Sequence, residues 1–221
     1  MTYSKLHVVY FIMLTAVGMA QNNLNDIHTL TEFINVSKQA PWETAQSDKG
    51  VSIQYRNLIL NDTLETRELL VRLTANTTLQ KAKKYVTLPE NIIQWNDAVK
   101  DIKYVKQNSS YWIAHTLYDI PFPLSKQDLV AKYWVEHDGN TIIIHVKSVP
   151  DAIPETKGYD RENYNLSQWR LIPKNNTITV EFAGITLSNS KIPRFIKDPI
   201  IQRKLLNSFI HLKTILETSD L

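Results

Sequence analysis

The stretch DLVAKYWVEHDGNTIIIHVKSV, residues 128–149, predicts a β-hairpin. Its two halves, residues 128–137 and 141–149, are rich in β-branched and aromatic side chains, which favour strands. Asp138-Gly139 lies between them and suits a tight turn, because such a turn requires positive φ angles. The chain therefore contains an antiparallel strand pair in its second half.

The first strand of this hairpin is apolar on both faces. One face carries Val130 and Trp134, and the other carries Leu129, Ala131, Tyr133 and Val135. A sheet with one face in water shows a cleaner alternation of apolar and polar residues. Two interpretations stay open: a sheet buried on both sides, or a curved sheet that closes around an apolar cavity.

Similar patterns extend the sheet on both sides of the hairpin. Strands are predicted at 51–57, 66–75, 102–106, 111–118, 169–172 and 177–186, with an Asn175-Asn176 turn between the last two. Helical spacing predicts a first helix within 26–39. Two short helices are expected before the third strand, one capped by Asn76 or Thr77 and the other starting at Pro89.

The chain closes with an amphipathic helix. Its apolar positions recur at spacings of three and four: Ile201, Leu205, Phe209, Leu212 and Leu216. Asp198 is the expected cap and Pro199 the expected first-turn residue. An antiparallel sheet must bury one face against this helix, so the prediction is one α+β domain.

Composition excludes several classes of function. Lys and Arg together number 25 against 22 Asp and Glu, an excess too small to indicate nucleic-acid binding. The absence of cysteine excludes disulfides, cysteine-based zinc sites and thiol catalysis. The five glycines are scattered, so a phosphate-binding loop is excluded as well. We expect no cofactor, no metal site and no catalytic residues.

The N-terminus predicts export. Lys5 precedes an uncharged apolar run of residues 8–20, which is too short to span a bilayer and ends in small residues. We expect residues 1–20 to be a signal peptide and residues 21–221 to be the domain, a monomer in the periplasm or secreted. A buried N-terminal helix or an uncleaved anchor is the alternative.

Two longer motifs resemble the START (steroidogenic acute regulatory protein-related lipid transfer) domain family. YDIPFPLSKQDLV (118–130) is similar to the family's proline turn before an Arg-Asp-hydrophobic-Val motif, and SVPDAIPETKGYDR (148–161) is similar to its Lys-Gly-x-x-Arg loop. Trp95, and Trp169 with Pro173, match further family positions, and the bacterial members are most similar. The resemblance implies a helix-grip fold, in which a curved antiparallel sheet wraps around a long C-terminal α-helix and encloses a lipid tunnel.

The chain also departs from the family pattern. Gln127 replaces the arginine that usually precedes the aspartate. Thr116 and Tyr133 stand where animal members often pair an acid with a base inside the tunnel. The resemblance therefore implies no specificity for sterols.

The resemblance implies ligand-binding residues on three elements. Arg161 is expected at the cavity mouth, where its guanidinium would hold a carboxylate or phosphate; the alternative is an ion pair with Glu155, Asp160 or Glu162. The tunnel walls would be Trp112, Tyr118, Trp134 and Trp169, and the covering helix would contribute Leu205, Phe209 and Leu212; all seven also suit an ordinary core. The loop 152–158 is either a gate or a rigid connection.

Three functions remain open at this point. The first is binding, with transfer as a further role, of a lipid or other hydrophobic ligand without catalysis, with transient contact to a membrane surface. The second is a cyclase- or aromatase-like enzyme on the same fold, for which His115, His145 and Lys132 are the available polar groups. The third is an interaction domain whose cavity is filled by its own side chains.

Overall fold

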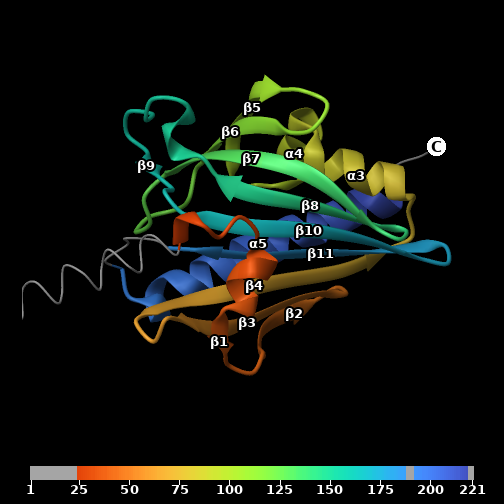
Figure 1. The fold of residues 1–221 in the computed structure, drawn as a ribbon. Coiled ribbons are helices and arrows are strands. Elements are labelled where there is room, and N and C mark those ends of the chain that lie inside the picture. Colours follow the sequence, from red (N-terminus) through yellow and green to blue (C-terminus); the bar gives the residue numbers. More distant parts are fainter. Residues whose placement is uncertain (1–23, 188–191, 219–221) are drawn as a thin grey trace, which may run out of the picture.

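An eleven-stranded sheet forms the body of the protein in the computed structural model, which describes residues 24–187 and 192–218 (Figure 1). The strand order is β1-β3-β4-β11-β10-β8-β7-β6-β5, with β2 added to β3 and β9 added to β7. The pairs are antiparallel except that β9 runs parallel to β7. The predicted α+β class with an antiparallel sheet and a long last helix is confirmed.

The strands are β1 (Ser37–Gln39), β2 (Glu43–Asp48), β3 (Val51–Leu60), β4 (Leu64–Ala75), β5 (Val99–Gln107), β6 (Trp112–Tyr118), β7 (Gln127–Asp138), β8 (Thr141–Ser148), β9 (Asp160–Arg161), β10 (Asn165–Lys174) and β11 (Thr177–Thr186). The helices are α2 (Leu30–Asn35), α3 (Leu79–Thr87), α4 (Pro89–Trp95), α5 (Arg194–Thr218) and the 3₁₀ turn η1 (Pro150–Ala152).

The two predicted hairpins form as expected. β7 and β8 pair from Ala131 with Ser148 to Asp138 with Thr141, and Gly139 in the turn has a φ of 56°. β10 and β11 meet at a turn in which Asn175 has a φ of 53°. Local turn chemistry alone explains both, because only residues that tolerate positive φ fit there.

The helix α5 lies across one face of the sheet, which we call the inner face (Figure 1). It packs on β2, β3, β4, α3 and α4, and it buries Phe209, Leu212 and Leu216 in the main core. The predicted start of this helix is wrong: it begins at Arg194, four residues before Asp198. Pro199 therefore lies inside the helix, where it cannot donate the backbone hydrogen bond to residue 195, and Asp198 forms an ion pair with Arg67 on β4 instead of capping.

The N-terminal helix is shorter than predicted. α2 starts at a capping box between Thr29 and Glu32 and ends at Asn35, after which 37–39 joins the sheet as β1. It packs Leu30 and Phe33 on the other face of the sheet, which we call the outer face, against residues of β3, β10 and β11. Both faces of the sheet are therefore partly covered, in agreement with the apolar pattern on both faces.

Sequence patterns missed the short strands β2 and β9, whose residues do not alternate clearly. The predicted signal peptide lies outside the residues that the structure describes. Among the described helices, none is both long enough and apolar enough to cross a membrane.

Candidate functional site

Four aromatic side chains meet on the inner face, under α5. Phe209 stacks on Trp169 of β10 with ring centroids 5.6 Å apart, and Trp95 of α4 meets both rings edge-on. Phe182 of β11 lies 4.8 Å from Trp169. The predicted positions of Trp169 and Phe209 on facing elements therefore agree with the structure, and at this place the interior is filled by the protein's own side chains.

A second aromatic group lies further across the inner face, on β6 and β7. Trp112 stacks on Tyr133 with centroids 5.3 Å apart and ring planes within 7°. Tyr118 lies at the other end of β6 and joins the same cluster. All three side chains keep part of their surface accessible although they point into the interior.

Three hydroxyl groups lie within this second group. Thr116 of β6 is 1% exposed, and its side chain lies beside the phenols of Tyr118 and Tyr133. Burial raises the pKa of Tyr118 to about 12, against a smaller opposing effect of Thr116. Burial also raises the pKa of Tyr133 well above its usual range, and the nearby Tyr118 adds to the shift.

The remaining predicted site residues fall in different places. Leu212 of α5 is fully buried, and Leu205 of the same helix is half-buried at the edge of the same core. Trp134 lies on the outer face, stacked on His145 with centroids 5.0 Å apart, beside a surface pocket of about 340 Å³. Its predicted role as a tunnel wall does not fit this position, because adjacent strand residues point to opposite faces.

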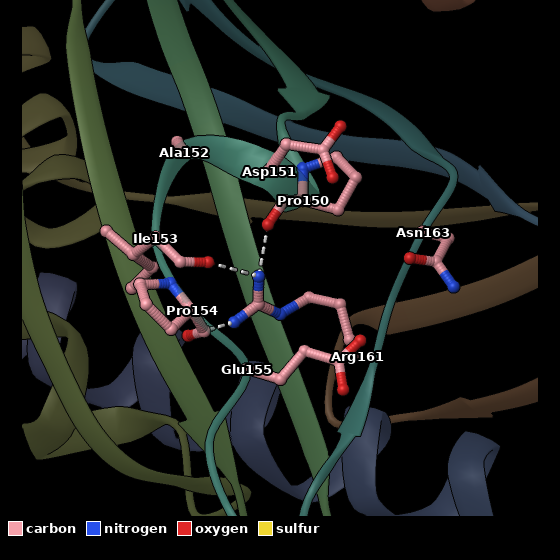
Figure 2. A pocket seen from close by; sticks show the side chains of 8 residues that line it. All are labelled: Pro150, Asp151, Ala152, Ile153, Pro154, Glu155, Arg161 and Asn163. Atoms are coloured by element: carbon pink, nitrogen blue, oxygen red, sulfur yellow. Dashed lines mark hydrogen bonds between the residues drawn. The ribbon is translucent and has the colours of Figure 1, made fainter.

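Arg161 is surrounded by protein acceptors (Figure 2). Its Nη1 donates to the carbonyls of Pro150 and Ile153, and its Nη2 donates to the carbonyl of Pro154 and to Asp128 Oδ2, the last two at 2.9 Å. The side chain is 2% exposed and that of Asp128 is 0% exposed. The protein partner of the guanidinium is Asp128, and not one of the alternative partners Glu155, Asp160 and Glu162.

The carboxylate of Asp128 has two further partners. His115 Nε2 lies 2.7 Å from Oδ1, and the Thr156 backbone N–H donates to Oδ2 at 2.9 Å. Burial would raise the pKa of Asp128, but the hydrogen bonds from Arg161, Thr156 and His115 outweigh it and hold the pKa below its usual range. The network fastens the segment 150–156 to the outer face of β6 and β7.

A shallow surface pocket of about 420 Å³ lies over this network (Figure 2). Its rim consists of Pro150, Asp151, Ala152, Ile153, Pro154, Glu155, Arg161 and Asn163. The guanidinium donates to backbone carbonyls of the rim and forms an ion pair with Asp128, so its charge is compensated within the protein. None of the residues that line it belongs to the aromatic groups of the inner face.

The polar groups considered for an enzyme also lie on the outer face. His115 bonds Asp128, and His145 Nε2 lies 2.7 Å from Glu136. Lys132 lies over the ring of Tyr111 at 4.5 Å. The described residues contain no group of three side chains placed to hold a metal ion.

Glu162 is the carboxyl group that burial disturbs most among those described. Burial raises its pKa to about 7, opposed by the Tyr164 backbone N–H and by the charge of Lys197 on α5. The unfolded value is 4.5, so the folded state binds this proton more tightly. Glu162 therefore favours folding below about pH 4.5, and this contribution is lost as the pH rises toward 7.

We expect Glu162→Gln to stabilise the protein at pH 8 and to flatten the dependence of stability on pH between 5 and 8. The expected gain at pH 8 is roughly 1–3 kcal/mol, since one unit of pKa corresponds to 1.36 kcal/mol. Urea unfolding at both pH values measures it. Glu155→Gln, at an exposed site nearby, should change nothing; equal pH dependence of Glu162→Gln and wild type would contradict the assignment.

From the sequence, Thr116 and Tyr133 were noted only as the positions where the family's acid–base pair is replaced. Thr116 lies on β6 and Tyr133 on β7, and their neighbours on the same face, Ala114, Leu129 and Ala131, are apolar. A hydroxyl group among apolar side chains was the signal available in the sequence. A hydroxyl on such a face needs a partner, and a single sequence does not reveal whether a distant element supplies one.

This architecture, with a long C-terminal helix held by an open antiparallel sheet, defines the helix-grip class. Comparison with solved structures places the chain within it as a START-like fold. A STAR-related lipid transfer protein from Xanthomonas axonopodis superposes with a TM-score of 0.70 at 21% identity, covering 80% of this chain and 99% of that one. Human StAR-related lipid transfer protein 5 gives a TM-score of 0.70 at 15% identity, covering 95% and 97%.

Other comparisons are less specific. An aromatase/cyclase from Streptomyces superposes with a TM-score of 0.51 at 8% identity, covering 68% of this chain and 94% of that one. A Pseudomonas aeruginosa protein described as uncharacterized is 28% identical over 126 residues, 56% of this chain and 62% of that protein, so the match spans less than two thirds of the relative. No protein-family model matches the chain.

Proposed function

We propose that this protein binds a lipid or other hydrophobic ligand between α5 and the inner face of β5–β8, without chemical change. The observation that carries the proposal is the second aromatic group: Trp112, Tyr118 and Tyr133 point into the interior and still keep accessible surface. The close packing partners of α5 are β2, β3, β4, α3 and α4, on the opposite half of the grip. The two START-fold lipid transfer proteins support the same reading.

The energy of such binding comes from apolar contact. A ligand that buries about 400 Å² of apolar surface gains roughly 10 kcal/mol at 25 cal/mol per Å². Association costs several kcal/mol, so micromolar affinity requires no ion pair. This agrees with the position of Arg161, whose charge is already paired with Asp128 inside the protein.

Binding of a hydrocarbon probe tests the proposal. Diphenylhexatriene has no polar group and fluoresces strongly only in apolar surroundings, so titration of the full chain should show saturable binding at micromolar concentration. Native mass spectrometry of protein purified from its own host should show a bound lipid. A chain that binds no probe and carries no lipid has a filled interior, which is the interaction-domain alternative.

A catalytic role has less support. An aromatase/cyclase shares the fold, but the polar groups that such chemistry would use here, His115, His145 and Lys132, point to the outer face. Fold alone does not assign an activity.

Ligand entry is proposed at the end of the sheet where β6 ends and β7 and β10 begin. β11 ends there too, and Arg194 at the start of α5 lies 3.9 Å from Glu65 at the start of β4. The Arg161 network fastens the loop 150–156, so the start of α5 and the loop 119–126 are the better candidates for the moving parts. Figure 1 shows β9 and the start of α5 at this end.

This end also presents exposed aromatic side chains. Phe122 in the loop 119–126 is 93% exposed and Phe195 on α5 is 80% exposed. Two aromatic side chains this exposed at one end of the molecule suit contact with a membrane surface. We propose transient membrane contact here by a monomer that is exported to the periplasm or secreted.

We expect Phe122→Asp and Phe195→Asp each to weaken binding to lipid vesicles about tenfold or more, since inserting one Phe side chain contributes roughly 1.5–3 kcal/mol. Val105→Asp is the control, because Val105 is an exposed apolar residue near the other end of β5. Vesicle sedimentation measures the effect. Equal binding of all three variants would exclude this end as the contact surface.

A further inference from the structure

The pocket of about 340 Å³ beside Trp134 lies on the outer face of the sheet, the face opposite α5. We call it the outer pocket; its lining residues are His28, Ser110, Tyr111, Lys132, Trp134 and Lys147. We propose that the outer pocket binds a phosphate monoester, with the phosphate beside Lys132 and Lys147 and the ester group against the aromatic rings. This second site is separate from the inner face and does not depend on the ligand proposed there.

A row of three lysines crosses the outer face. Lys132 of β7 lies directly opposite Lys147 of β8. On its other side Lys132 lies opposite Ile113 of β6, which in turn lies opposite Lys106 of β5. These four strands lie side by side in Figure 1. Like charges directly opposite each other destabilise a sheet, so the row favours an anion between the ammonium groups.

The charge of Lys132 is not compensated by a carboxylate. Its Nζ lies over two rings, 4.5 Å from the centroid of Tyr111 and 5.9 Å from that of Trp134. It takes part in no ion pair with residues 24–187 or 192–218. The ring faces attract a cation without neutralising it, so the ammonium group can still bind an anion.

Lys147 has one N–H group left for a ligand. Its Nζ donates to the carbonyl of Ile27 at 2.8 Å and lies 3.0 Å from His28 Nδ1, and an ammonium group has three donors. Burial lowers the pKa of Lys147; the charge of Glu32 opposes this shift, and the charge of Lys132 adds to it. The two lysines therefore repel each other in the folded protein, and a bound anion would relieve that repulsion.

Two carboxylates on neighbouring elements have other partners. Glu32 of α2 accepts the backbone N–H groups of His28 at 2.7 Å and of Thr29 at 3.3 Å. Glu136 of β7 lies 2.7 Å from His145 Nε2. No aspartate or glutamate is among the residues that line the outer pocket. An anion can therefore enter the pocket without meeting a like charge on its walls.

Two aromatic rings form the apolar part of the pocket. Trp134 stacks on His145 and also lines the pocket, as does Tyr111. A hydrogen bond with Lys106, together with the charges of Lys106 and Lys132, lowers the pKa of Tyr111 against a smaller effect of burial. Flat rings beside cations suit a ligand that joins an anionic group to a ring or another short apolar group.

A phosphate monoester matches the charge of the outer pocket better than a carboxylate does. At pH 7.5 it carries close to two negative charges, because its second pKa is about 6. A carboxylate carries only one, whereas Lys132 and Lys147 together offer two positive charges. Two sources share this chemistry: a soluble phosphate ester, and a lipid whose head group is a phosphate monoester.

Titration calorimetry of the full chain with phenyl phosphate, benzoate and inorganic phosphate tests the proposal at pH 7.5 and low salt. We expect phenyl phosphate to bind with a Kd of about 1 mM or below, and the other two about tenfold more weakly. Benzoate lacks one charge, and inorganic phosphate lacks the ring. Absence of phenyl phosphate binding would overturn the site, and equal affinity for all three anions would overturn the choice of ligand class.

Variants place the binding in the outer pocket. Lys132→Gln should weaken phenyl phosphate binding about tenfold or more, while Trp134→Leu should weaken it and leave inorganic phosphate unchanged. Lys174→Gln is the matched control, because it makes the same change of charge at the exposed end of β10. An equal loss in Lys174→Gln would show that only the net charge matters and would overturn the site. The three anions are compared on wild type, so a variant that fails to fold leaves the proposal testable.

Vesicles distinguish the two sources of the ligand. Wild type is compared on phosphatidylcholine vesicles that contain either phosphatidic acid, a monoester, or phosphatidylglycerol, a diester with one charge. A preference for phosphatidic acid that Lys132→Gln removes would support a lipid head group as the ligand. Binding of phenyl phosphate without this preference would support a soluble ester. A preference that persists in Lys132→Gln while phenyl phosphate binding is unchanged would overturn the assignment to the outer pocket.

Discussion

Arg161→Ala is expected to lower the free energy of unfolding by about 3–5 kcal/mol, the usual cost of removing one partner of a buried ion pair. The variant leaves the fully buried carboxylate of Asp128 without its guanidinium and three backbone carbonyls without a donor. Domains of this kind have total stabilities of about 5–15 kcal/mol, so a large part of the stability is at risk.

Urea unfolding measures this loss, and Arg72→Ala is the matched control. Arg72 pairs with Glu181 at 2.7 Å, but its side chain is 47% exposed, so the expected loss is about 1 kcal/mol or less. Arg161→Met/Asp128→Leu should be more stable than Arg161→Ala, because it removes both charges together. A loss below about 1 kcal/mol in Arg161→Ala would show that the network contributes little.

The same variant should affect ligand binding only slightly. The four donated hydrogen bonds of Arg161 go to the protein, so we expect the folded fraction of Arg161→Ala to bind diphenylhexatriene within about tenfold of wild type. A larger loss of affinity in a variant that still folds would indicate that Arg161 contacts the ligand.

Phe209→Asp is expected to abolish ligand binding and to destabilise the protein by more than about 4 kcal/mol. Phe209 is 2% exposed and contacts the rings of Trp95, Trp169 and Phe182. A carboxylate at this position would lie in an apolar core, and the lost ring contacts add to its desolvation cost. The variant therefore separates α5 from the sheet.

Phe195→Asp provides the control for this prediction, because it makes the same change on the same helix at a position that is 80% exposed. Its stability should stay within about 0.5 kcal/mol of wild type. Circular dichroism during thermal unfolding, with diphenylhexatriene binding, measures both effects. A Phe209→Asp variant that folds and binds the probe like wild type would contradict the claim that Phe209 holds α5 on the sheet.

Most of the fold was predictable because its signals are local. The alternation in 66–75 and 141–149 depends only on the two-residue period of a strand, and the Asp138-Gly139 turn depends on the φ angles of two residues. The core face of α5 follows from its apolar spacing, and α4 starts at Pro89 as expected. The length of α2 was wrong because pairing of 37–39 with β3 ends the helix early.

The candidate site was predictable only in part, because its contacts join residues far apart in the chain. Arg161 pairs with Asp128 and not with the carboxylates near it in the sequence, because the parallel pairing of β9 with β7 places Arg161 beside Asp128. Trp134 and Tyr133 are adjacent in sequence and point to opposite faces, and only the packing of α5 shows which face is inside.

The sequence by itself determined the strands, the hairpins and the apolar face of the last helix, because period and turn chemistry act over a few residues. The tertiary structure alone decided that Arg161 pairs with Asp128 and donates to three backbone carbonyls, and that Tyr133 faces the interior while Trp134 faces outward, because these contacts depend on every element that packs around a group.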